Sequence, residues 1–170
     1  NAVTNVLKSS TQMGKNVSNF EKKISKLFEK KYGLMVNSGS SALLLAMETL
    51  DFPEGSEIIT PALTFSTTVG YIVRNKWIPV FVDVEEGTYC INENKIKNLI
   101  TKKTRAIVAP HLMGNIVNWK KISPFLKKRG IIIVEDSADT LGATYKNQST
   151  GRHADISITS FYGSHIINCA

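Results

Sequence analysis

The sequence predicts a three-layer α/β domain in which helices cover both faces of a mostly parallel sheet. Short apolar runs alternate along the chain with longer segments whose apolar residues repeat every three or four positions. Some short runs, such as 131–134, are apolar at every position, which indicates strands covered on both faces. No linker or internal repeat interrupts this alternation, so the 170 residues are expected to form one continuous unit.

The first elements are expected from residue 19 onward. A helix is predicted over 19–32, with Gly33 ending it. Its apolar stripe consists of Phe20, Ile24, Leu27 and Phe28. A short strand over 34–36 and a turn of small residues lead into a helix over 42–50. Because this second helix is apolar almost all round, we expect it to be buried.

The rest of the chain continues the same alternation. Helices are predicted over 67–75, 92–100 and 119–128, and strands over 57–60, 79–84, 105–109, 131–136 and 155–160. In an open α/β sheet, ligands collect at the carboxyl ends of the strands. The loops that follow these strands are therefore expected to share one functional rim.

The composition is that of an ordinary globular protein, with 42% hydrophobic and 21% charged residues. It disfavours disordered, collagen-like and disulfide-scaffold classes. Cys90 and Cys169 form no close pair and no cluster with histidine, so we expect neither a metal site nor a disulfide framework. No apolar run reaches the roughly 20 residues that span a bilayer, and no secretory signal is recognisable. A cytoplasmic protein without a membrane partner is expected.

The net charge of +7 does not by itself predict nucleic-acid binding. The lysines recur on the expected helices, within 22–31, 95–103 and 120–129, beside apolar residues three or four positions away. This spacing is typical of the solvated faces of amphipathic helices. We therefore expect no nucleic-acid partner.

A candidate anion site lies at the start of the helix near residue 40. Gly39 and Ser40 begin this helix, where free backbone amides and the helix dipole favour a phosphate group. Simple capping of the helix by Ser38 or Ser40 explains the same residues equally well.

Three further candidates follow other strands. Asp136 closes a buried apolar strand, where a carboxylate needs a cation or hydrogen-bond donors. A protonated pyridine nitrogen meets that need, and so does capping of the next turn. Phe65 fits either a core aromatic or a platform for a ring. His165 fits either a structural histidine or a general acid-base group, because its ordinary pKa is near neutrality.

Taken in order, these segments resemble the DegT/DnrJ/EryC/StrS family of sugar aminotransferases, which are pyridoxal-phosphate (PLP) enzymes with the aspartate aminotransferase fold. The resemblance implies that residues 1–170 are the N-terminal part of the cofactor-binding large domain and that the C-terminal remainder is absent. The matching positions are Gly14, Phe20-Glu21, Asn37-Ser38-Gly39-Ser40-Ser41-Ala42-Leu43, 51–68 with Thr60-Pro61 and Thr64-Phe65, 79–84, His111, Gly114-Asn115, Glu135-Asp136-Ser137-Ala138-Asp139, Gly151, Asp155 and Ser160-Phe161-Tyr162.

The resemblance also implies roles for individual residues. Gly39, Ser40 and Ser160 would bind the cofactor phosphate. Phe65 would stack on the pyridine ring, and Asp136 would pair with the ring nitrogen. A protonated nitrogen makes the ring an electron sink for a carbanion formed beside it.

Position 165 departs from the usual pattern of the family. Typical members have a lysine there that binds the cofactor covalently, and His165 cannot form that bond. A related subgroup, the nucleotide-sugar 3-dehydratases, carries histidine at this place. It also carries an aspartate three residues after the one that pairs with the pyridine, and Asp139 matches that feature. The resemblance therefore implies His165 as the catalytic base and Asp139 as a further residue of the cofactor site.

The implied reaction uses pyridoxamine phosphate (PMP) or PLP. It removes the C3 hydroxyl of a nucleotide-linked 4-keto-6-deoxyhexose, such as GDP-4-keto-6-deoxymannose, in deoxysugar biosynthesis. L-Glutamate would regenerate the amine, and a homodimer is expected. Two other functions remain open: a PLP-dependent nucleotide-sugar aminotransferase, and a non-catalytic module that binds the cofactor or a nucleotide sugar.

Overall fold

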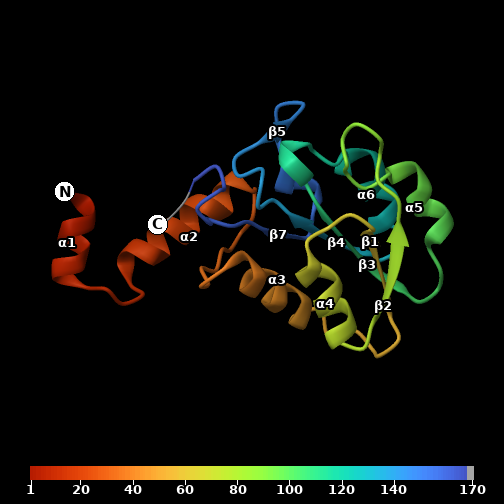
Figure 1. Ribbon diagram of the computed structural model, residues 1–170, viewed down its shortest axis with the longest axis horizontal. Coiled ribbons are helices and arrows are strands. Elements are labelled where there is room, and N and C mark those ends of the chain that lie inside the picture. The colour runs from red at the N-terminus through yellow and green to blue at the C-terminus, as the bar shows by residue number, and fades with distance from the viewer. Residues whose placement is uncertain (168–170) are drawn as a thin grey trace.

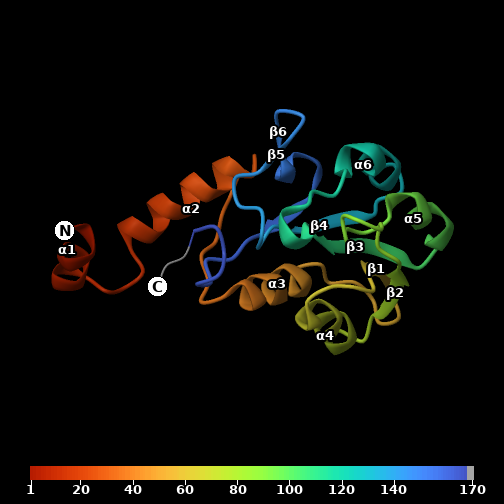
Figure 2. The same cartoon turned by 45° about the horizontal axis from the view of Figure 1, so that its top comes forward.

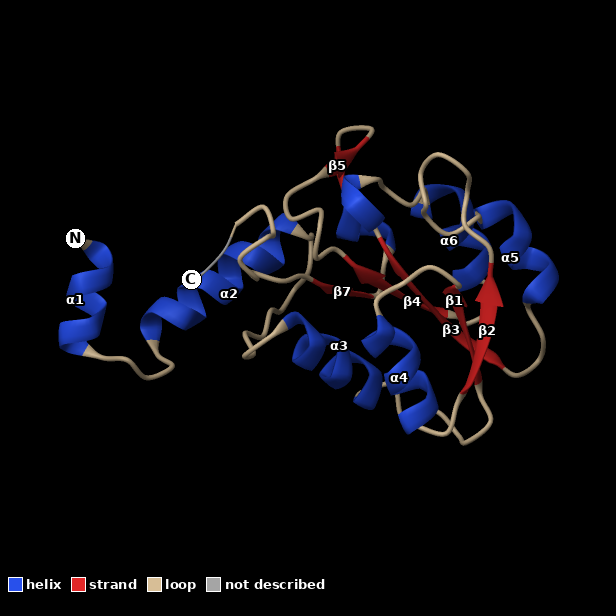
Figure 3. Ribbon diagram, viewed as in Figure 1, coloured by secondary structure: helices blue, strands red, loops and turns tan. Residues whose placement is uncertain are grey.

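A five-stranded sheet forms the centre of the computed structural model, which describes residues 1–167 (Figure 1, Figure 3). The strands lie in the order β2-β1-β3-β4-β7, and every neighbouring pair is parallel. The predicted α/β class with a mostly parallel sheet is confirmed. The strands are β1 (Glu57–Pro61), β2 (Ile78–Val82), β3 (Thr104–Pro110), β4 (Ile132–Asp136) and β7 (Ile156–Ile158).

Helices cover both faces of this sheet (Figure 2). One face carries α3 (Gly39–Glu48) and α4 (Ser66–Arg74), and the other carries α5 (Glu93–Leu99) and α6 (Trp119–Lys127). This arrangement gives the three layers that the sequence predicts.

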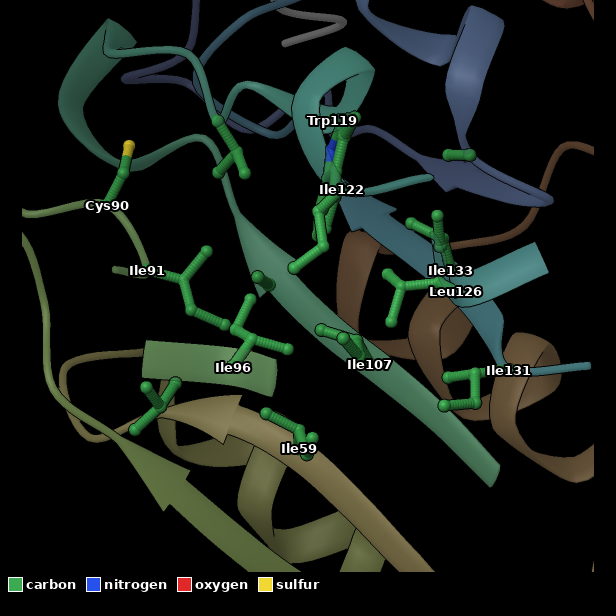
Figure 4. Packing of buried hydrophobic residues seen from close by; sticks show 14 residues of the cluster. Ile59, Cys90, Ile91, Ile96, Ile107, Trp119, Ile122, Leu126, Ile131 and Ile133 are labelled. Atoms are coloured by element: carbon green, nitrogen blue, oxygen red, sulfur yellow. The ribbon is translucent and has the colours of Figure 1, made fainter. Parts of the chain in front are cut away.

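Each face of the sheet has its own hydrophobic core, because successive strand residues point to opposite faces. Ile58 packs in the cluster that contains residues of α3 and α4, and its neighbour Ile59 packs in the cluster with α5 and α6. The second cluster is shown in Figure 4, where side chains of α6 lie over Ile107 and Ile133. Ile58 and Ile59 are both fully buried.

The path of the chain creates a topological switch point between β1 and β3. From β1 the chain crosses to β2 through α4, and it then returns past β1 to β3 and continues to β4 in the opposite direction. Connections leave the carboxyl ends of β1 and β3 toward different faces. Open α/β sheets bind ligands in the crevice at such a point.

Two predicted features of the N-terminal third are wrong. No strand forms over 34–36, because the Met35 amide donates to Glu21 Oε1 of α2 (Lys15–Leu27) at 2.8 Å and not to a neighbouring strand. Gly33 does not cap the helix, since α2 ends at Leu27. Instead, Gly33 packs against the side of α2, where a Cβ would lie 2.7 Å from the Glu21 carbonyl oxygen.

Apolar stripes are also less completely covered than predicted. In α2, Leu27 belongs to the predicted stripe but is 48% exposed. In α3, Leu45 is 42% exposed, so this helix is not buried all round. Both side chains are therefore partly accessible on the described part of the chain.

Several short elements have no counterpart in the sequence prediction. Figure 1 shows α1 (Ala2–Ser9) beyond the N-terminal end of α2 and away from the sheet. A hairpin joins β5 (Thr144–Tyr145) to β6 (Gln148–Ser149), and its two turn residues have positive φ, as tight hairpin turns require. Two 3₁₀ helices, η1 (Leu112–Gly114) and η2 (Thr150–His153), complete the elements within residues 1–167.

The composition led to expectations about the two cysteines and about membrane-spanning segments. Cys90 is a buried free thiol, whereas Cys169 lies outside the described residues. Within residues 1–167, no helix combines the length and hydrophobicity needed to cross a membrane.

Replacing Gly151 with alanine is expected to destabilise the fold by about 2 kcal/mol or more. A Cβ at this position would overlap the Phe28 carbonyl oxygen and lie 2.9 Å from the Phe28 Cβ, so η2 would have to move away from Phe28, the residue that follows α2. Gly70→Ala is the matched control, because a Cβ at Gly70 of α4 meets nothing within 4 Å. Thermal denaturation of both variants checks the prediction, and equal melting temperatures would contradict it.

Candidate active site

The start of α3 lies directly against the segment that follows β7. A Cβ at Gly39 would lie 2.9 Å from the Ser160 Cβ, so only glycine permits this approach. Ser38 caps the helix: its Oγ accepts a hydrogen bond from the Ser41 amide at 3.1 Å. The Gly39 and Ser40 amides, which precede the capped Ser41 amide, also belong to the first turn, where helices leave backbone donors unused. The structure thus brings Gly39, Ser40 and Ser160 together, and both capping and an anion site are compatible with it.

Asp136 ends β4 at the same rim and is partly buried. Its Oδ1 accepts a hydrogen bond from the Ala138 amide at 3.0 Å, so the carboxylate also caps the following turn. Burial raises the pKa of Asp136 above its ordinary value, and the nearby Asp139 carboxylate raises this pKa further. The Ala138 hydrogen bond and the His111 and His165 imidazoles oppose this shift. A cation at this place would relieve the cost of burying the charge.

The structure brings Asp139 and His165 together. Asp139 Oδ1 lies 3.8 Å from His165 Nε2, and Asp139 Oδ2 accepts a hydrogen bond from the Met113 amide at 3.1 Å. The other ring nitrogen, His165 Nδ1, is buried and has no hydrogen-bond partner among the described residues. Tyr162 packs edge-on against the imidazole, with the ring centroids 5.9 Å apart.

Phe65 is displayed at the rim and does not belong to the core. It precedes α4, and its side chain is 64% exposed. The core-aromatic interpretation is therefore wrong for the described chain. The exposed ring lies after β1, next to the switch point between β1 and β3.

A second ionisable pair, sealed behind this rim, was not predicted as functional. His111 Nε2 lies 3.4 Å from Glu135 Oε2, and both side chains are completely buried. In the sequence, the only available signal is that Glu135 is charged and stands inside an apolar strand.

The segment that contains His165 is anchored to α2. The rings of Phe161 and Phe20 are 5.0 Å apart, and Figure 1 shows the end of the described chain beside this helix. This contact connects residues that are far apart in the sequence and places the final turn beside the rim.

The sequence profile of the DegT/DnrJ/EryC1/StrS aminotransferase family matches residues 1–170. The chain belongs to this family. The matched range includes every rim residue described above, from Gly39 to His165.

Similar members of the DegT/DnrJ/EryC1/StrS family include sugar dehydratases. The chain is 40% identical over 162 residues to dTDP-4-dehydro-2,6-dideoxy-D-glucose 3-dehydratase of Saccharopolyspora spinosa, covering 91% of the chain and 35% of that protein. It is 36% identical to the structure of E. coli GDP-4-keto-6-deoxy-D-mannose-3-dehydratase with bound hydrated PLP, with a TM-score of 0.80 over 86% of the chain and 40% of the other.

Another solved structure, a mutant of GDP-4-keto-6-deoxymannose-3-dehydratase with bound GDP-perosamine, has 34% identity and a TM-score of 0.92 over 98% of the chain and 45% of the other. The family also includes aminotransferases. The aminotransferase from Psychrobacter cryohalolentis has 32% identity and a TM-score of 0.90 over 98% of the chain and 43% of the other. The chain spans less than half the length of each of these relatives.

Proposed function

We propose that the full-length gene product removes the C3 hydroxyl of a nucleotide-linked 4-keto-6-deoxyhexose, such as GDP-4-keto-6-deoxymannose, with PMP as cofactor. The observation that carries this proposal is the pairing of His165 with Asp139 at the rim. A histidine at this place supplies acid-base chemistry without a covalent bond to the cofactor. The similarity to two 3-dehydratases supports the same reaction.

The rim fits a phosphorylated pyridine cofactor. The close approach of Gly39 to Ser160 brings the first-turn amides of α3 beside the Ser160 hydroxyl, and donors of these two kinds suit a phosphate group. The partly buried Asp136 carboxylate, whose pKa is raised by burial, is the group that would hold a protonated ring nitrogen. Ser40 and Phe65 are proposed as further contacts, to the phosphate and to the ring face.

PMP supplies an amine for the 4-keto group and a pyridinium ring that accepts electrons. The chain supplies the proton transfers. Asp139 Oδ1 faces His165 Nε2, so in the neutral ring Nε2 carries the proton and Nδ1 is left as the base. Nδ1, which is buried and has no hydrogen-bond partner within residues 1–167, can then take up a proton during elimination and return one to the departing C3 oxygen. Asp139 Oδ1 holds the imidazole in this orientation between the two transfers.

The decisive experiment identifies the sugar product by mass spectrometry. The full-length gene product is incubated with PMP and GDP-, CDP- or dTDP-linked 4-keto-6-deoxyhexose. C3 dehydration followed by hydrolysis gives a sugar that lacks one oxygen atom, with one PLP and one ammonia formed for each sugar. An amino group in place of the C4 oxygen would instead establish the aminotransferase, which the similarity to the Psychrobacter enzyme favours as the second candidate. Failure to bind PMP would favour a non-catalytic module.

Two partners belong to the same proposal. L-Glutamate is proposed as the amino donor that restores PMP, so its addition should convert a single turnover into continuous product formation. A homodimer is proposed as the active assembly. Light scattering of the full-length gene product measures this state directly.

Replacing Gly39 with alanine is expected to weaken PMP binding by about tenfold or more. The new Cβ would lie 2.9 Å from the Ser160 Cβ and 3.2 Å from its Oγ, and it would push the two phosphate-binding segments apart. Equilibrium dialysis or fluorescence titration with PMP measures the affinity. Gly70→Ala again serves as the control, and an unchanged affinity in Gly39→Ala would contradict the proposed phosphate site.

A further inference from the structure

Behind the rim, two ionisable side chains are sealed inside the protein. Glu135 precedes Asp136 in β4 and therefore points to the opposite face of the sheet. Its Oε2 lies 3.4 Å from His111 Nε2, and both side chains are 0% exposed. Its Oε1 accepts hydrogen bonds from Ser137 Oγ at 2.9 Å and from Thr150 Oγ1 at 3.1 Å. Polar groups are buried at a cost unless their partners are in place, and the proposed function uses neither member of this pair.

The partners of the His111 ring determine which nitrogen carries its proton. His111 Nδ1 accepts the hydrogen of the Val117 amide at 2.9 Å, so Nδ1 bears no proton. The proton of the neutral ring is therefore on Nε2, where it faces the Glu135 carboxylate. His111 Nε2 and Glu135 Oε2 make no hydrogen bond in the structure, so Glu135 acts on the ring through its charge, which favours a proton on the nitrogen that faces it and leaves Nδ1 as the acceptor.

The hydrogen bond from Val117 to His111 closes the loop 111–117, which contains η1. Within this loop Met113 has a positive φ of 54°, a backbone conformation that a non-glycine residue keeps only where its surroundings hold it. In this conformation the Met113 amide donates to Asp139 Oδ2 at 3.1 Å. The other oxygen of the same carboxylate faces His165. The closed loop and the His165 imidazole therefore contact the two oxygens of one carboxylate.

We propose that His111 and Glu135 are positioning residues that orient Asp139 toward His165 through the loop 111–117. The proposal rests on the proposed function for the roles of Asp139 and His165. His111 acts by holding Val117, and Glu135 acts by holding the His111 ring in its accepting form. Second-sphere partners of this kind commonly fix the tautomer and orientation of a functional group.

Two substitutions of His111 separate this role from a general loss of packing. An asparagine oxygen can replace Nδ1 as the acceptor for the Val117 amide, whereas glutamine extends its amide toward Glu135 and leaves Val117 unpaired. Hydrogen–deuterium exchange across 112–117 is measured in the full-length gene product without cofactor. We expect exchange about tenfold or more faster in His111→Gln, and within about threefold of the unsubstituted protein in His111→Asn.

Equal exchange in the two variants would overturn the loop-closing role. Fast exchange in His111→Asn alone would also overturn it, so the test holds even if His111→Gln does not fold. Glu135→Gln provides an independent check, because its amide donors oppose the proton on His111 Nε2. We expect Glu135→Gln to open the loop when residue 111 is histidine and to have no further effect in the His111→Asn background.

A double-mutant cycle with Asp139→Asn tests whether the loop acts through Asp139. We expect His111→Gln to lower kcat by about 10- to 100-fold in the otherwise unsubstituted protein, and by less than about threefold when residue 139 is already asparagine. Additive losses would overturn the proposal. The cycle follows whichever sugar product the mass-spectrometric assay detects, so an amino-sugar product would refute the proposed dehydration and leave this test valid. If no sugar is converted, the exchange measurements decide the loop-closing role alone.

Discussion

Asp136→Asn is expected to lower the sugar reaction rate by about 100-fold or more. The amide keeps the shape of the side chain and can still accept the hydrogen bond from the Ala138 amide. It carries no negative charge, so it cannot hold a proton on the nitrogen of a bound pyridine ring, and the ring loses its capacity to accept electrons. Steady-state kinetics with saturating PMP measure this loss. PMP affinity, measured separately, is expected to fall as well.

The same substitution is expected to stabilise the protein without cofactor at neutral pH. Burial raises the folded-state pKa of Asp136 above its ordinary value of 3.8, so the folded state binds more protons than the unfolded state between these two pKa values. The free energy of unfolding therefore falls as pH rises through this window. Above the folded-state pKa, the full loss of stability caused by the Asp136 charge is present. Asp136→Asn lacks this titration, so its advantage in melting temperature should be smallest below the ordinary pKa and should grow with pH.

Asp155→Asn is the matched control for both measurements. Asp155 is also a carboxylate beside a strand, and its Oδ2 accepts a hydrogen bond from the Ile133 amide at 2.8 Å, at the end of β4 opposite to the rim. An asparagine there can accept the same bond, and we expect no change in PMP affinity. A variant of Asp136 that loses turnover but gains no stability at neutral pH would contradict the assignment of a buried, desolvated charge.

The sheet and the residues at its rim could be predicted because parallel strands combine two local signals. An apolar run such as 131–134 identifies a strand covered on both faces, and the direction shared by all strands places the residues after them at one edge. Asp136 and Ser160 were assigned to the rim on this basis, and the structure places both there. The fold class followed from the same two signals.

The remaining features depend on contacts that leave no periodic signal. The strand predicted over 34–36 fails because a side chain of α2 takes the Met35 amide, and this competition is invisible in a short apolar run. The contact of Asp139 with the Met113 amide uses a backbone donor, which every non-proline residue has. Its geometry depends on a positive φ at a residue that is not glycine, and the sequence gives no indication of it.

His165→Lys is expected to abolish C3 dehydration and to create a covalent PLP-binding protein. The lysine amine would occupy the position to which the resemblance assigns a covalent bond to PLP in typical family members, and a site that holds the cofactor covalently cannot provide the free imidazole base that elimination needs. General acid-base groups of this kind contribute about 10²- to 10⁴-fold to rate. We expect His165→Lys to lose at least this contribution to turnover. Borohydride reduction followed by mass spectrometry would detect PLP attached to residue 165.

His165→Asn separates loss of the base from gain of the amine. It should lose turnover to a similar extent, retain PMP affinity within about threefold and show no attachment of PLP after reduction. The side chain of His165 is only 19% exposed and contacts Tyr162 edge-on, so an asparagine leaves a small gap that melting curves can monitor. Unchanged turnover in either variant would refute His165 as the base. If His165→Lys both binds PLP covalently and forms a new amino-sugar product, this one position decides between deoxygenation and amine transfer.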